Sequence, residues 1–264
     1  MASQTNPRFL YGISALLLSA TVVALVLAIL PGPAFRVGVI DLGTAFAALG
    51  WGFRVAAATA VLALLALIVA FAGCGRGLVR RYGVAFVLSG LVAGGLYLLY
   101  TDARSYVPIH DVTTDLDDPP QFVALAAGGT DTRPVPDRGR ADLAKLTPEE
   151  RWRSYHREAY ADLRPLVVPA DVAAVTRAAA DAARAMGWEI AAVDPAAGRV
   201  EATDTTAWFG FKDDIVVRVR ATDDGGARVD VRSVSRIGIS DVGANAKRIR
   251  AFLKRLAART GDRA

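Results

Sequence analysis

The chain has 264 residues, a formal net charge of +5 and a mean hydropathy of +0.32, and this apolar content excludes a purely soluble protein. Six of its 31 basic residues and one of its 26 acidic residues lie in residues 1–100. Subtracting these leaves 25 of each in the remainder, so the C-terminal part lacks the basic excess that nucleic-acid binding needs. We therefore expect no nucleic-acid partner.

Three apolar stretches predict membrane-spanning helices at about residues 10–30, 55–73 and 82–100. Each is long enough to cross a hydrocarbon core of roughly 30 Å, and in lipid each must be helical to pair its backbone groups. No charged residue lies inside them, whereas transporters usually carry ionisable groups there. Residues 1–100 are therefore expected to anchor the chain in a lipid bilayer. Small residues at every fourth position, such as Gly90 and Gly94, predict close helix packing.

The short connection between the second and third spans predicts the orientation of the chain. Residues 74–81 hold Arg76, Arg80 and Arg81 and no acid, so this connection is expected in the cytoplasm with the N-terminus. Everything after Tyr100 then lies outside. Between the first two spans, Asp41 is expected to cap a short helix. The chain has one cysteine, so no intrachain disulfide is possible.

Residues 101–147 are predicted to form an extended arm and a loop, because prolines and glycines interrupt both. An α+β domain is expected over residues 148–264. Its first helix opens with a capping box at Thr147–Glu150, and Asp171 caps a second helix that ends before Gly187.

Alternation of apolar and polar residues predicts a four-stranded antiparallel meander packed against helices. The strands expected are Trp188–Val193, Arg199–Thr206, Asp214–Thr222 and Arg228–Arg236. The turn between the last two predicts that Val219 faces Val229, that Val217 faces Val231 and that Arg218 faces Asp230. The aromatic connection Trp208–Phe211 is expected to cap the core. Ser240 or Asp241 should cap a final helix that points Val242 inward.

Several stretches resemble the family catalogued as domain of unknown function 1499: Pro108–Asp115, Pro119–Phe122, Glu201–Thr203, Phe211–Asp214, Val231–Arg236 and Ser240–Ile249. The resemblance covers roughly residues 107–258, and the three-span segment is similar to one bacterial subgroup. It implies an integral protein of the bacterial inner membrane with a periplasmic C-terminal domain, and it implies no established activity. Many relatives carry cysteines in the arm, and this sequence has none there.

A cluster of polar residues is expected where the last strand meets the last helix. The candidates for binding an anion or a partner are Arg232, Ser233, Ser235, Arg236, Ser240, Asp241, Asn245 and Arg248. Helix N-termini attract anions, and arginines add charge-assisted hydrogen bonds. The alternative is an internal network that ties the strand to the helix. We expect an acid of the arm, Asp111 or Asp115, to pair with Arg236 or Arg248.

The arm also offers weak metal candidates in His110, Asp111 and Asp115, although the sequence lacks paired histidines or a calcium-loop spacing. No metal or other cofactor is expected. The leading hypothesis is a non-enzymatic, membrane-anchored extracytoplasmic module that binds an envelope protein or an anionic ligand. The alternative is a hydrolase-like enzyme that uses His110 and neighbouring carboxylates, for instance with Ser235 and Asp241.

Overall fold

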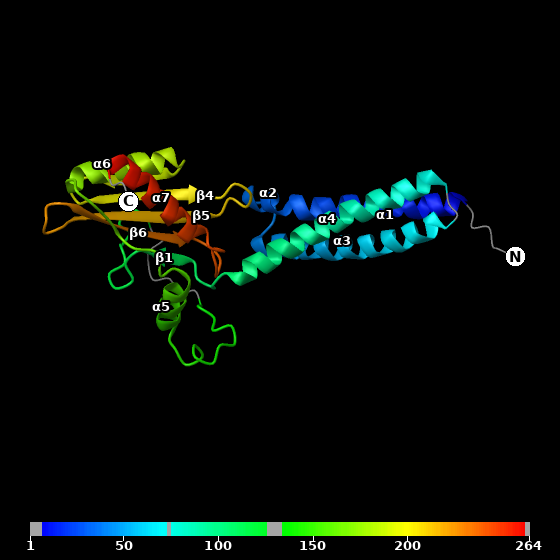
Figure 1. Cartoon of the computed structure of the whole chain (residues 1–264), viewed down its shortest axis with the longest axis horizontal. Helices are drawn as coiled ribbons and strands as arrows, with labels where there is room; N and C mark the ends of the chain where they lie inside the picture. Colours follow the sequence, from blue (N-terminus) through cyan, green and yellow to red (C-terminus); the bar gives the residue numbers. More distant parts are fainter. Residues whose placement is uncertain (1–6, 73–74, 126–133, 262–264) are drawn as a thin grey trace. The chain divides into compact units, whose positions relative to one another are not determined.

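The computed structural model describes residues 7–72, 75–125 and 134–261, and Figure 1 labels its elements. The chain divides into two compact units. One consists of Met1–Ala103 with Ala207–Gly210, and the other of Arg104–Thr206 with Phe211–Ala264. Cys74 and the pair Gly128-Gly129 lie outside the described residues.

Three helices of the first unit are long and apolar enough to cross a membrane, as predicted. They are α1 (Pro7–Ile29), α3 (Leu42–Phe71) and α4 (Arg76–Ser105), and the short α2 (Pro31–Arg36) lies between the first two. Asp41 caps α3 by accepting from the backbone N–H of Thr44 at 2.8 Å. The short helix expected after Asp41 is therefore the first part of α3 itself. The arginines expected in a connecting loop instead begin α4.

Side chains inside the helical unit link α4 to α1. The hydroxyls of Thr21 and Ser89 are 2.9 Å apart, and the Tyr82 hydroxyl donates to the carbonyl of Leu10 at 2.8 Å. The prediction that Gly90 and Gly94 mark a close helix contact is wrong for the described residues, because a Cβ at either position would meet no atom within 4 Å. Polar pairs, not these glycines, join the helices here.

The aromatic connection Trp208–Phe211 does not cap the sheet core as expected. Its residues Ala207–Gly210 group with the helical unit, where the ring of Phe209 lies 6.0 Å from that of Phe35 and 5.7 Å from that of Phe46. Trp208 donates from Nε1 to the carbonyl of Ile29 at 3.1 Å. The signal failed because aromatic residues in a turn indicate burial without indicating the surface that buries them.

The second unit contains three helices, α5 (Pro148–Ala159), α6 (Val172–Ala185) and α7 (Ala244–Thr260). The capping box of α5 and the Asp171 cap of α6 form as predicted. The prediction for α7 is wrong at its start, because the helix begins after Gly243, which has a φ of 75°. Val242 is 42% exposed and does not point inward.

The sheet has six antiparallel strands, not four. They are β1 (Asp111–Thr113), β2 (Leu166–Val168), β3 (Glu189–Asp194), β4 (Arg199–Thr205), β5 (Lys212–Ala221) and β6 (Ala227–Ser235). The order is β1-β6-β5-β4-β3, and β2 pairs with the other end of β6. The sequence missed β1 and β2 because strands of three residues beside prolines carry no readable alternation.

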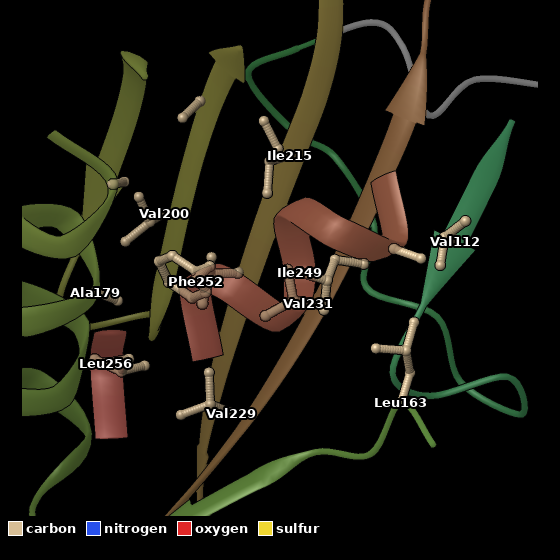
Figure 2. Packing of buried hydrophobic residues seen from close by; sticks show 14 of the residues in the cluster. Val112, Leu163, Ala179, Val200, Ile215, Val229, Val231, Ile249, Phe252 and Leu256 are labelled. Atoms are coloured by element: carbon tan, nitrogen blue, oxygen red, sulfur yellow. The ribbon is translucent and has the colours of Figure 1, made fainter. Parts of the chain in front are cut away.

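The register of β5 and β6 is as predicted. Val219 pairs with Val229, Val217 with Val231, and Arg218 with Asp230. The valines face α6 and α7, which cover one side of the sheet (Figures 1 and 2). On that side Phe252 of α7 stacks on Trp188 with ring centroids 5.2 Å apart. The charged residues that alternate with these valines along β5 and β6 lie on the opposite face of the sheet.

Candidate functional site

The junction of β6 and α7 is held together by Arg248. Its guanidinium pairs with Asp213 at 2.6 Å and with Asp204 at 2.7 Å, and only 6% of its side chain is exposed. It also donates to Ser233 and Asn245. This arginine is therefore neutralised by carboxylates of the protein itself.

The other predicted residues of the junction are tied together in the same way. Arg236 donates two hydrogen bonds of 2.9 Å to Asp214, whose side chain is 2% exposed. The Asn245 amide bridges Ser233 and Ser235 at 2.7 and 3.0 Å. These contacts correspond to the internal network that was the alternative to an anion site.

Asp241 serves the start of α7, although it is not the residue at the helix boundary. Its carboxylate accepts from the backbone N–H groups of Gly243 at 2.9 Å and Asn245 at 2.8 Å. Burial raises the pKa of Asp241, while these two hydrogen bonds act in the opposite direction. Ser240 donates from its hydroxyl to the carbonyl of Val107 at 3.0 Å.

The arm crosses this junction and contacts it with backbone carbonyl groups, not with its acidic side chains. The carbonyl of His110 accepts from the Ser235 N–H and from the Asn245 side chain, and the carbonyl of Ile109 accepts from the Asp241 N–H. The prediction that an arm acid pairs with Arg236 or Arg248 is wrong. Acids of β4 and β5 reach both arginines first, because they lie on strands adjacent to the junction.

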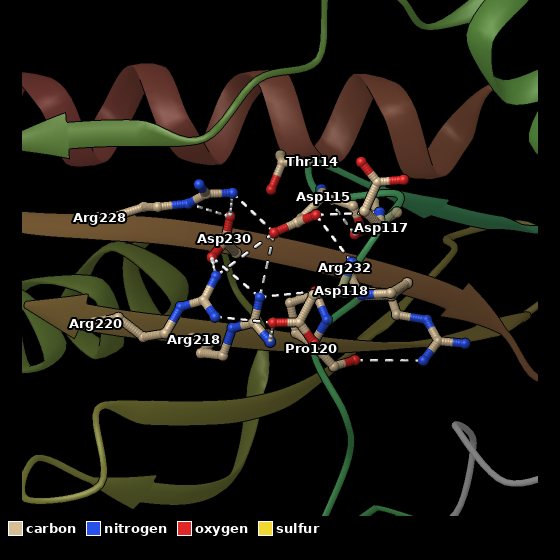
Figure 3. A network of polar contacts seen from close by, with 12 residues as sticks. Thr114, Asp115, Asp117, Asp118, Pro120, Arg218, Arg220, Arg228, Asp230 and Arg232 are labelled. Atoms are coloured by element: carbon tan, nitrogen blue, oxygen red, sulfur yellow. Dashed lines mark hydrogen bonds and ion pairs between the residues drawn. The ribbon is translucent and has the colours of Figure 1, made fainter. Parts of the chain in front are cut away.

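The acids of the arm neutralise a row of arginines on the open face of the sheet (Figure 3). Asp111 makes a bidentate pair with Arg232, its nearest contact being 2.7 Å. Asp115 pairs with Arg228 at 2.8 Å, and Asp118 pairs with Arg220 at 2.8 Å.

These ion pairs offset the repulsion between arginines that face each other on adjacent strands. Arg220 and Arg228 lie directly opposite each other on β5 and β6, and like charges in that position destabilise a sheet. The fully buried Asp230 contacts both arginines at 3.0 Å, and the arm adds further carboxylates above them. The arm is therefore an electrostatic cover for this face.

Glu201 fixes the far end of the arm. Its carboxylate is fully buried on β4 and accepts from the backbone N–H groups of Val123, Ala124 and Leu125 at 2.8–2.9 Å. Arg199 lies 3.3 Å from the same carboxylate. Three consecutive N–H groups form a concave anion site of the kind that usually holds a ligand. Here the sheet itself supplies the anion.

The weak metal candidates of the arm each contact a different partner. His110 is 5% exposed with Nδ1 3.4 Å from the carbonyl of Ile239, and Asp111 and Asp115 pair with arginines of β6. Within residues 7–72, 75–125 and 134–261, no three histidine, cysteine or acidic side chains come together as metal ligands.

A polar cavity of about 400 Å³ lies between the arm and the end of α5. Thr113 and Asp115 line it from the arm, and His156, Arg157 and Arg164 line it from α5 and the following segment. Both of these arginines are exposed. Among the described residues, neither arginine makes an ion pair with a carboxylate, in contrast to those of the junction.

His156 forms the buried wall of the cavity. Its Nε2 accepts from the backbone N–H of Thr113 at 3.1 Å, so the neutral ring carries its proton on Nδ1. Burial lowers the pKa of His156 to about 4, although the nearby charge of Asp111 opposes that shift. The ring is therefore neutral at pH 7 and connects β1 to α5.

A profile of the family described as protein of unknown function (DUF1499) matches residues 111–256. The chain belongs to this family. A search of curated proteins found no match. The DUF1499 match begins at the first residue of β1 and ends within α7, so it includes the arm from Asp111 onward, Glu201 and the residues that line the cavity. The arm is thus part of the family's domain.

The sequence did not reveal that the arm contacts Glu201 and the row of arginines on the sheet. It also did not indicate the cavity arginines. One usable signal was present: the alternation that placed Arg218, Arg220 and Arg232 on one face also left that face with too few acids. The arm holds four carboxylates between residues 111 and 122, namely Asp111, Asp115, Asp117 and Asp118. Charge balance between the arm and the sheet would have predicted their contact.

Proposed function

We propose that this chain is a membrane-anchored, extracytoplasmic binding module that takes a small ligand with a carboxylate or phosphate group in the cavity beside His156. The observation that carries the proposal is the contrast between two sets of arginines. Those of the junction and the sheet are paired with buried carboxylates, whereas Arg157 and Arg164 line a cavity without such a partner among the described residues. Arginines in a polar hollow favour planar anions.

The walls of the cavity support recognition of a polar ligand. Asp115 is already neutralised by Arg228, so its charge does not repel an anion strongly. His156 is neutral and held by Thr113, which makes it a fixed wall. The proposed ligand would then meet guanidinium groups on one side and the arm on the other.

The membrane orientation belongs to the same proposal. Arg76, Arg80 and Arg81 lie at the start of α4, and the residues after Ser105, except Ala207–Gly210, belong to the second unit. The positive-inside rule supports a cytoplasmic start for α4 and an extracytoplasmic second unit. In a bacterial cell this corresponds to an inner-membrane protein with a periplasmic domain.

Ligand-dependent thermal stability of the full chain in detergent tests the binding site. Inorganic phosphate and citrate serve as probes, and native mass spectrometry identifies anions that co-purify. A bound probe should raise the unfolding temperature, since a ligand at 100 times its Kd stabilises the folded state by about 2.7 kcal/mol. The double variant Arg157→Ser, Arg164→Ser should lose this shift.

The matched control is Arg177→Ser with Arg259→Ser, which removes two exposed arginines from α6 and α7 outside the cavity. It should respond to the probes as the unmodified chain does. Equal shifts in both double variants would contradict the cavity as the site. If no probe shifts the unmodified chain and no anion co-purifies, the proposal of an anionic ligand is wrong.

A further inference from the structure

The connection between β6 and α7 exposes apolar side chains, and its backbone conformation keeps them at the surface. Ile237, Ile239 and Val242 are 40, 45 and 42% exposed. Val242 has a φ of 47°, a left-handed conformation that is costly for a β-branched residue. Strain of this kind persists only where the surroundings enforce it, and it frequently marks a functional segment.

Contacts with the arm enforce this conformation. The N–H of Asp241 donates to the Ile109 carbonyl at 3.2 Å, and the Ser240 hydroxyl donates to the Val107 carbonyl at 3.0 Å. The Val242 N–H in turn donates to the Ser240 hydroxyl at 3.2 Å. The polar groups of the loop therefore point toward the domain, and its apolar side chains are left outside.

Tyr106 packs against the end of this loop within the second unit. The Tyr106 ring packs so closely on Gly243 that a Cβ there would lie 2.4 Å from it, and Lys247 donates to the Tyr106 hydroxyl at 3.1 Å. Tyr106 directly follows Ser105, the last residue of α4. Arg138 donates to the carbonyls of Arg104 and Tyr106 and so joins the helix end to the same unit.

The height of the loop above the bilayer follows from the helix rise. The apolar stretch of the third span ends near Tyr100, and five further residues of helix add about 7.5 Å. A loop beside Tyr106 then lies at the level of the lipid headgroups. Branched apolar tips flanked by basic side chains, here Arg236 and Lys247, have the chemistry of an interfacial segment.

We propose that the loop Arg236–Val242 inserts its apolar side chains into the headgroup region of the bilayer. The loop adjoins Gly243, which packs on Tyr106, and Tyr106 directly follows the apolar helix α4, which favours lipid as the occupant of this surface. Such a contact would add to the attachment to the bilayer that the apolar helices provide. It goes beyond the proposed ligand site and does not depend on it.

Quenching by lipid-attached spin labels tests the insertion. The full chain with Cys74→Ser is reconstituted into vesicles, and a single cysteine introduced by Ile239→Cys carries an environment-sensitive fluorophore. Val167→Cys is the matched control, because Val167 is also an exposed branched residue, 51% exposed, in the same unit. It pairs with Arg228 of β6, about 24 Å along the strand from Ser235. Leu99→Cys, at an exposed position of α4 near the end of its apolar stretch, is the reference for contact with lipid.

We expect quenching at position 239 to approach that at position 99, with blue-shifted emission, and position 167 to remain unquenched. The proposal is overturned if position 239 behaves like position 167. It is also overturned if the emission at position 239 is blue-shifted without quenching by lipid labels, because a second copy of the chain would then cover the loop.

Discussion

Two arginines on the same helix show how burial decides what an ion pair contributes. Arg248 and Arg250 both lie on α7 and both pair with aspartates at 2.6 Å. The Arg248 pair is 6 and 3% exposed, whereas the pair of Arg250 with Asp162 is 42 and 57% exposed. Removing one partner of a buried pair leaves an uncompensated charge, and an exposed pair contributes little.

The Arg248→Ala variant should therefore lose about 3–5 kcal/mol of unfolding free energy. The loss arises because Asp213 and Asp204 remain near the junction without their cation. Arg250→Ala is the matched control and should lose about 0–1 kcal/mol. Thermal or denaturant unfolding of the full chain in detergent measures both values. Equal losses in the two variants would show that Arg248 does not hold the junction.

His156 predicts a specific dependence of stability on pH. Its pKa is about 4 in the folded chain and near 6.5 in the unfolded chain, so between these values only the unfolded chain takes up the proton. The contribution to stability is complete above pH 6.5 and decreases as the pH falls toward 4, by about 3 kcal/mol in total.

The His156→Gln variant cannot titrate, and its amide oxygen can still accept from the Thr113 N–H. Its unfolding temperature should consequently change less than that of the unmodified chain between pH 6.5 and 4.5. The difference between the two profiles isolates His156 from carboxylates that titrate in the same range. Parallel profiles would mean that His156 is not held in its neutral form.

At the scale of elements, the arm is the part of the fold that sequence reasoning described least well. Long periodic elements were predictable, since the capping box of α5 and the alternation of β5 and β6 are local signals. The pairing of β1 with β6 is a contact between residues more than 100 positions apart, and a three-residue strand carries no periodicity. The ion pairs of the β6–α7 junction were not predictable for a related reason. The arginines of the junction were identifiable in the sequence, but the acids that pair with them lie on other strands and were not.

Glu201→Gln tests whether the arm is fixed by the buried carboxylate. Glutamine keeps the size of the side chain but loses the charge and one acceptor, so the three hydrogen bonds to residues 123–125 cannot all persist. A hydrogen bond to a charged group contributes about 1.5–3 kcal/mol. Amide hydrogen exchange at residues 123–125 should accelerate.

Glu189→Gln is the control for this experiment, because Glu189 is an exposed glutamate on the neighbouring strand β3. It should leave exchange in the arm unchanged. If Glu201→Gln also leaves residues 123–125 protected, the Asp115 and Asp118 pairs hold the arm without help from Glu201.

For the whole molecule, the distribution of charge is the feature that the amino-acid sequence alone reveals. The basic excess lies in residues 1–100, and the rest of the chain carries equal numbers of acids and bases. The structure shows how the second unit uses that balance, with carboxylates of the arm above arginines of the sheet (Figure 3). The three long apolar helices account for the hydropathy of the remainder.

We propose that the helices anchor a domain on the outer side of the membrane, and reporter fusions test this orientation most directly. Alkaline phosphatase folds only outside the cytoplasm. A fusion after Arg104 should be active, and a fusion at Gly77, beside the arginines that begin α4, should be inactive. An active fusion at Gly77 together with an inactive fusion after Arg104 would contradict the account.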